Sequence, residues 1–177
     1  MIRKAAEFAA KAHAGMHRKG TDIPYIYHPM EAALIVAQMT GDEEVIAAAY
    51  LHDVLEDTQV TAEELGALFG SRVLSLVSAA TDDKSLPWKE GKAATIEHLK
   101  TAPYEVKLLT LGDKLSNLWS TARDYMVLGD GVWQRFHEKR RECHQWYMEG
   151  ILAGLAELET FPAYQELRRL YQFVYGT

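Results

Sequence analysis

Apolar side chains recur every three or four positions along most of the chain. The repeat runs through residues 2–17, 30–39, 42–57, 61–69, 71–80, 88–99, 103–118, 132–158 and 162–175. This period is typical of amphipathic helices, because residues three and four apart lie on the same helix face. No stretch shows the alternation of a strand bounded by turn residues. We therefore expect an all-α protein, a bundle of about eight or nine helices around one core.

Composition narrows the classes of protein to consider. The 177 residues are 48% hydrophobic and 25% charged, which is ordinary for a globular protein, and we expect one domain over residues 1–177. A net charge of −6 gives no support to nucleic-acid binding, which favours basic surfaces. No apolar run is long enough to cross a membrane, so we expect no membrane partner.

The cellular compartment follows from two features. The single cysteine, Cys143, excludes an internal disulfide and fits a reducing compartment. Residues 1–4 lead directly into the amphipathic pattern instead of an apolar signal block. We therefore expect a cytoplasmic protein, whose oligomeric state the sequence leaves open.

The densest group of reactive side chains follows the apolar, Ala-rich residues 42–50. It contains His52, Asp53, Glu56 and Asp57, which gather on one side of the last two turns if the helix continues. An imidazole beside three carboxylates is costly to bury in an apolar core. The group is suited to holding a divalent cation and activating a water beside it. A solvated, acidic helix end is the alternative interpretation.

Two further candidates lie elsewhere in the chain. His28 precedes Pro29, which is favourable at the start of a helix, so we expect His28 at a loop-to-helix junction. Asp113 lies within an otherwise apolar helix, and a buried carboxylate must be paired or must coordinate a metal. Asn117 follows one turn later on the same face. A capping histidine and a salt-bridged aspartate are the alternatives.

The two histidines and two aspartates form a mixed nitrogen and oxygen ligand set. Such a set suits Mn²⁺, Fe²⁺ or Zn²⁺ better than Ca²⁺, and it lacks the thiolates of many structural zinc sites. Four protein ligands can leave one or two coordination positions open for water and substrate. The order H…HD…D resembles that of the HD-domain metal-dependent phosphohydrolases, which are all-helical.

Flanking motifs make the resemblance more specific. The elements RKG and PYIYHP (residues 18–20 and 24–29), HDVLEDT (52–58) and DKLSN (113–117) are similar to motifs of the RelA/SpoT-homologue hydrolase domains. The elements TDDK and LP (81–84 and 86–87) resemble the hydrolase-only branch, the small alarmone hydrolases. The resemblance covers about residues 1–150. The chain length predicts no synthetase or regulatory domain.

The resemblance implies an HD-type hydrolase that releases the 3′-pyrophosphate of guanosine tetra- or pentaphosphate, with Mn²⁺ as cofactor. It implies that His28, His52, Asp53 and Asp113 hold the metal, and that Glu56 and Asp57 position and deprotonate the attacking water. The implied substrate contacts are Arg18, Lys19, Asn117, Ser120 and Lys139. The planar guanidinium of Arg18 can stack on a purine, whereas Lys19 supplies a point charge near phosphate. An ordinary basic loop is the alternative for that pair.

Two other functions compete with this one. The same site could hydrolyse another small-molecule nucleotide, such as an adenine alarmone, a nucleoside monophosphate or the 2′-phosphate of NADPH. A non-catalytic nucleotide sensor is the third hypothesis. Glu56 and Asp57 argue against the sensor, since a protein that only binds has no need of a pair that activates water.

Overall fold

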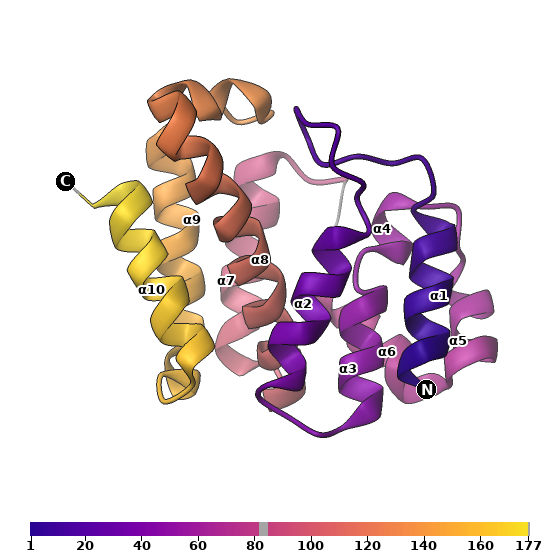
Figure 1. Cartoon of the computed structure of the whole chain (residues 1–177). Helices are drawn as coiled ribbons and strands as arrows, with labels where there is room; N and C mark the ends of the chain where they lie inside the picture. The colour runs from indigo at the N-terminus through magenta and orange to yellow at the C-terminus, as the bar shows by residue number, and fades with distance from the viewer. Residues whose placement is uncertain (82–84, 177) are drawn as a thin grey trace. The chain divides into compact units, whose positions relative to one another are not determined.

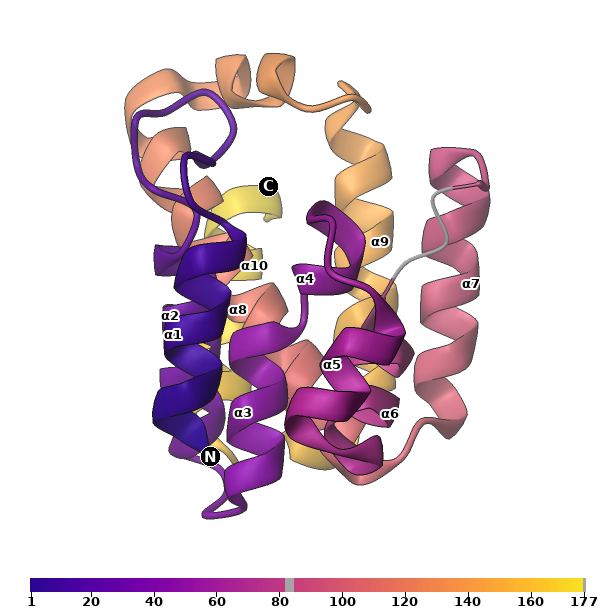
Figure 2. The ribbon, with the colours of Figure 1, turned by 90° about the vertical axis from the view of Figure 1, so that its right-hand side faces the viewer.

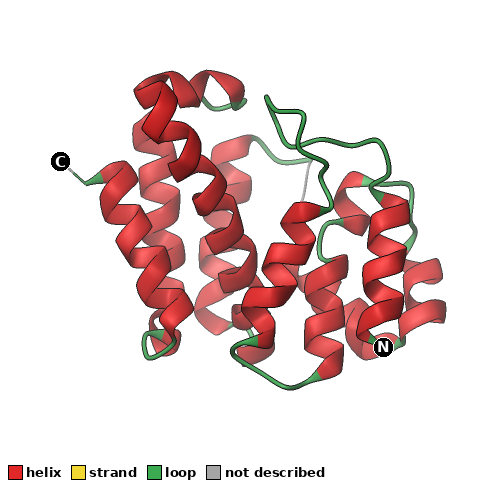
Figure 3. Cartoon of the chain, viewed as in Figure 1, coloured by secondary structure: helices red, strands yellow, loops and turns green. Residues whose placement is uncertain are grey.

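All regular secondary structure in the described part of the chain is helical. The structure, a computed structural model, describes residues 1–81 and 85–176, and in these Figure 3 shows helices and loops without strands. One isolated antiparallel bridge pairs His17 with Pro24. The all-α prediction is therefore confirmed. Within these residues no helix combines the length and the apolar character needed to cross a membrane.

The helices group into two compact units. The first consists of residues 1–81 and 104–113, and the second contains the described residues of 82–103 and 114–177. One domain over residues 1–177 stays a prediction. In the TDDK element, Asp82, Asp83 and Lys84 lie outside the described residues.

One helix is central to the first unit. The unit contains α1 (Ile2–Ala12), α2 (Tyr27–Ala37), α3 (Glu43–Leu51), α4 (Val54–Asp57), α5 (Ala62–Phe69), α6 (Ser71–Ala80) and residues 104–113 of α8 (Tyr104–Leu128) (Figure 1). Helix α3 packs against α1, α2 and α6. Its Ala47, Ala48 and Ala49 are fully buried, and small side chains let the neighbouring helices approach. The His52–Asp53 pair follows directly at the end of this buried helix.

Side-chain caps fix the starts of two helices, and a glycine allows one helix to approach another closely. The Asp42 carboxylate accepts hydrogen bonds from the backbone of α3, and the Thr61 hydroxyl accepts one from Glu64 N in α5. Gly112 of α8 lies against α2, where an added Cβ would stand 2.8 Å from Ala32 O. The missing side chain therefore lets the α8 backbone approach α2, and with it the neighbouring Asp113.

The second unit is built on α9 (Arg141–Gly154). It also contains α7 (Trp88–Thr101), the rest of α8, α10 (Pro162–Tyr175) and two 3₁₀ helices, η1 (Gly129–Arg135) and η2 (Ala156–Leu158). Helix α9 packs against α7 and α10, and Figure 2 shows α7 running alongside α9. Gly150 of α9 faces the side chain of Ile96 in α7, so the two helices pack closely there.

Several predicted helix boundaries were wrong. Helix α1 ends at Ala12 instead of residue 17, because the chain turns through Gly15 with a φ of 79°. The helix predicted over residues 132–158 is broken: η1 ends at Arg135, and Phe136 has extended backbone before α9 begins. At the end of η1, Arg135 pairs with Asp124 of α8. Without the single turn α4, nine α-helices remain in the described residues, in line with the expected eight or nine.

Candidate active site

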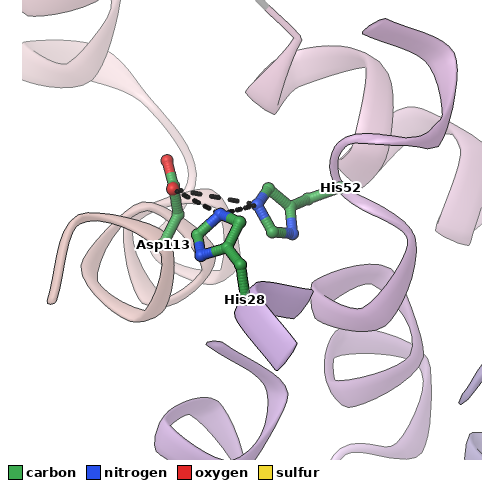
Figure 4. A group of neighbouring side chains, drawn as sticks. All are labelled: His28, His52 and Asp113. Atoms are coloured by element: carbon green, nitrogen blue, oxygen red, sulfur yellow. Dashed lines mark hydrogen bonds and ion pairs between the residues drawn. The ribbon is translucent and has the colours of Figure 1, made fainter. Parts of the chain in front are cut away.

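Three side chains from distant parts of the sequence converge in the first unit. His28 comes from the first turn of α2, His52 from the end of α3 and Asp113 from α8, and Figure 4 shows all three pointing toward one another. His28 Nε2 lies 3.1 Å from His52 Nε2 and 3.3 Å from Asp113 Oδ1. His52 Nε2 lies 3.8 Å from the same oxygen. The chain thus brings two imidazole nitrogens and a carboxylate oxygen to one point.

Asp53 adds a second carboxylate. Its Oδ2 lies 3.1 Å from His52 Nε2 and 3.3 Å from His28 Nε2. Two ligands that are each about 2.1 Å from one cation lie about 3.0 Å apart at a right angle and about 3.4 Å apart at the tetrahedral angle. Most of the spacings among these four residues fall in or beside that range. The residues therefore fit a shared divalent cation.

The hydrogen bond of His52 orients its ring for this role. Its Nδ1 lies 2.8 Å from the backbone oxygen of Ala49, one turn earlier in α3. In the neutral ring, Nδ1–H donates to that carbonyl, and the lone pair of Nε2 then faces His28 and the carboxylates. A backbone carbonyl is a common outer partner of a metal-binding histidine.

His28, His52, Asp53 and Asp113 form one cluster, and its two carboxylates control its charge. Burial acts to lower the pKa of His52, but Asp53 and Asp113 outweigh it and raise that pKa to about 9. Burial also acts to raise the pKa of Asp53, whereas His52 and His28 together bring it well below its usual range. Asp53 is therefore ionised and the cluster attracts positive charge, either a proton or a metal cation.

The HD pair lies in a turn and not inside one long helix. The prediction of a continuous helix over residues 42–57 was wrong in this detail. Helix α3 ends at Leu51, residues 52 and 53 form a turn, and the single turn α4 begins at Val54. Helix α2 begins at Tyr27, so His28 is its second residue and not the residue before it.

Glu56 and Asp57 lie on α4, one turn after the HD pair. Both side chains are partly exposed, and Asp57 Oδ2 lies 3.1 Å from the Tyr25 hydroxyl. That hydroxyl also donates to Asp53 Oδ2, at 2.7 Å. The Tyr25 hydroxyl thus connects Asp57 to Asp53 of the metal-ligand group.

Sequence reasoning missed Tyr25 and His13. Tyr25 belongs to the PYIYHP element, but a tyrosine in a loop gave no signal of a bond to two distant carboxylates. The His13 ring packs on the Tyr25 ring at 4.9 Å between centroids, and neither of its nitrogens has a hydrogen-bond partner among the described residues. Burial lowers the pKa of His13 and keeps the ring neutral. In the sequence it reads as one more position of a helical face.

The predicted substrate contacts fall into two groups. Arg18 lies in the loop before α2, with its guanidinium 5.8 Å from the centre of the Tyr25 ring, and Lys19 is exposed beside it. Asn117, Ser120 and Lys139 belong to the second unit. Ser120 is buried in α8, Asn117 is partly buried four residues after Asp113, and Lys139 is exposed between η1 and α9.

A comparison with known proteins identifies the family of the chain. The pattern of the HD domain family matches residues 5–137, about three quarters of the chain. The chain belongs to the HD domain family. His28, His52, Asp53 and Asp113 all lie within the matched residues.

Several relatives of this HD domain protein carry a named activity. The guanosine-3′,5′-bis(diphosphate) 3′-pyrophosphohydrolase MESH1 of Xenopus tropicalis is 39% identical over 158 residues, which cover 88% of this chain and 84% of the relative. The guanosine-3′,5′-bis(diphosphate) 3′-pyrophosphohydrolase of Aquifex aeolicus is also 39% identical over 158 residues, but these cover only 21% of its length.

The fold has a close counterpart among solved structures. A metazoan orthologue of SpoT, described as hydrolysing ppGpp, matches with a TM-score of 0.83 at 30% identity, over 99% of this chain and 96% of the other. The resemblance to RelA/SpoT-type hydrolases predicted from the motifs is therefore confirmed.

Proposed function

We propose that this HD domain protein hydrolyses the 3′-pyrophosphate of guanosine alarmones, ppGpp and pppGpp, to GDP or GTP and pyrophosphate, with Mn²⁺ as its metal. One observation carries the proposal. His28, His52 and Asp113 converge in a chain that is 39% identical, over 88% of its length, to a pyrophosphohydrolase of that specificity. The mixed nitrogen and oxygen set supports a divalent transition metal, and Mn²⁺ accepts such ligands.

The four residues of the cluster would hold the cation. A bound divalent cation supplies Lewis-acid chemistry: it makes water more acidic and offsets negative charge on a phosphoryl group. His28 and His52 bind from the buried side, since their side chains are 1% and 5% exposed. Asp53 and Asp113 are more open, at 14% and 18%, so water and substrate reach the cluster from the carboxylate side.

Glu56 and Asp57 supply the proton acceptor. Asp57 is joined to Asp53 through the Tyr25 hydroxyl, which supports a role beside the cation without direct ligation. A carboxylate in this position can orient the attacking water and take its proton. Arg18 and Lys19 would provide positive charge for the nucleotide, with Asn117, Ser120 and Lys139 as further proposed contacts. The named activity of the relatives supports a nucleotide as substrate. The cytoplasmic location, the absence of a nucleic-acid partner and the single domain stay predictions.

A substrate panel tests the function. Metal-stripped protein is reloaded with Mn²⁺ and offered ppGpp, pppGpp, an adenine alarmone, nucleoside monophosphates and NADPH, and pyrophosphate and orthophosphate are measured separately. We expect pyrophosphate from the guanosine alarmones, and weaker activity after reloading with Zn²⁺ or Mg²⁺. Orthophosphate alone, for instance from NADPH, would replace the proposal with a phosphatase.

Two matched substitutions test the chemistry. Glu56→Gln and Asp57→Asn keep the size of each side chain but remove the proton acceptor, so we expect turnover to fall about 10²–10⁴-fold with Mn²⁺ still bound. Calorimetric Mn²⁺ titration of each variant supplies the control. Turnover that survives both changes would refute the assigned roles.

A further inference from the structure

The Tyr25 hydroxyl lies between two carboxylates with different proposed tasks. It donates to Asp53 Oδ2 at 2.7 Å and approaches Asp57 Oδ2 at 3.1 Å. Asp53 Oδ2 is the same oxygen that lies 3.1 Å from His52 Nε2. One hydroxyl therefore touches the ligand oxygen that faces the cluster and the carboxylate proposed to take a proton.

The ring that carries this hydroxyl is held from several sides. His13 of α1 packs on it at 4.9 Å between centroids, and His28 of α2 meets it edge-on at 5.8 Å. The Tyr25 backbone N–H donates to Met16 O at 2.9 Å, which ties the loop to the segment after α1. The hydroxyl thus has a fixed place, set by packing that does not involve the two carboxylates.

The hydroxyl also stays a donor. A tyrosine phenol, with an ordinary pKa of about 10, keeps its proton at neutral pH. A protonated hydroxyl between two carboxylate oxygens reduces their mutual repulsion and fixes their relative orientation. Outer partners of this kind typically change metal affinity or activity 10–100-fold when they are removed.

We propose that Tyr25 is a positioning residue that couples the metal ligand Asp53 to the proton acceptor Asp57. The inference rests on the proposed function for the role of Asp57, whereas the contact with Asp53 can be tested with metal alone. Tyr25 acts through the two carboxylates and needs no contact with the nucleotide.

Tyr25→Phe removes the hydroxyl and keeps the ring. We expect kcat at saturating Mn²⁺ to fall about 10–100-fold and KM to stay within about threefold, because the loss affects the geometry of the acceptor and not nucleotide binding. Calorimetry without substrate should show Mn²⁺ binding weaker by about threefold or more, since Asp53 loses its outer partner. Tyr27→Phe is the matched control, because Tyr27 is exposed and two residues away; all three quantities should be unchanged.

A double substitution separates this role from a structural one. If Tyr25 acts through Asp57, the variant with both Tyr25→Phe and Asp57→Asn should turn over no more slowly than Asp57→Asn alone. Unchanged Mn²⁺ affinity in Tyr25→Phe overturns the proposal, even if no nucleotide in the panel is a substrate. Unchanged kcat at saturating Mn²⁺, additive losses, or a rise in KM alone would equally overturn it. Thermal unfolding of Tyr25→Phe close to that of the parent protein confirms that the variant is folded.

Discussion

Two histidines in different units each hydrogen-bond a backbone carbonyl, His52 through Nδ1 and His144 through Nε2, but their side-chain surroundings differ. In the first unit, His52 bonds Ala49 O at 2.8 Å; in the second, His144 bonds Glu138 O at 2.7 Å. Carboxylates surround His52 and raise its pKa to about 9. The rings of Trp133, Trp88 and Phe136 surround His144, and burial lowers its pKa.

The difference lies in the neighbours and not in the residue type. A histidine among carboxylates attracts a proton or a metal, whereas a histidine stacked on aromatic rings stays neutral and contributes packing. His144 stacks on Trp133 with ring centres 5.2 Å apart and planes 21° apart. The surroundings of the buried His52 ring therefore suit binding of a cation, whereas those of the partly buried His144 ring suit packing.

The strongest test of this contrast removes a carboxylate from the first unit. Asp113→Ala leaves two imidazoles and one carboxylate, so we expect Mn²⁺ affinity to drop more than about 100-fold, beyond the range typical of an outer partner. Turnover of the alarmone should fall to background. Calorimetry and the pyrophosphate assay measure both effects. Mn²⁺ binding that is unchanged would remove Asp113 from the ligand set.

The second-largest effect concerns how metal binding at His52 depends on pH. The pKa of His52 is about 9 in the metal-free fold against about 6.5 in an unfolded chain, so its proton stabilises the fold below pH 6.5. That contribution is lost as the pH rises through about 9. A bound cation needs the neutral ring, so below pH 9 the proton competes with the metal.

We therefore expect Mn²⁺ affinity to rise with pH between 6.5 and 9, by up to about tenfold per unit. The gap between the melting temperatures of the Mn²⁺-bound and metal-free protein should widen over the same range. Calorimetry in two buffers of different ionisation enthalpy should show a proton released on binding at pH 7.5. A gap that does not change with pH would contradict the assignment of His52 as a ligand.

The smallest effect is expected in the second unit. His144→Phe keeps the aromatic stack but leaves Glu138 O without its ring donor, so we expect the free energy of unfolding to fall by about 1 kcal/mol. Mn²⁺ affinity and its pH dependence should match those of the parent protein. Denaturant unfolding and calorimetry measure the two. A change in metal binding would mean that the two histidines are not as independent as their surroundings indicate.

Helix content was predictable, and helix ends were less so. The three-to-four residue repeat predicted an all-α chain because each helix buries one apolar face. The repeat did not predict the break at residues 136–140, because a contact such as the ion pair of Arg135 with Asp124 beside it leaves no trace in helical spacing. Nor did it separate α3 from α4, since the turn at Asp53 leaves the sequence spacing unchanged.

The site, too, was predictable from the sequence only in part. Sequence determined which residue types are present, their order, and the motifs that carry the family resemblance, because these are properties of the chain itself. Only the tertiary structure decided that residues 28, 52 and 113 meet at distances of 3 to 4 Å, and that Tyr25 joins Asp53 to Asp57. Helical spacing relates positions within one element, whereas such contacts depend on how α2, α3 and α8 pack, as the close approach at Gly112 illustrates.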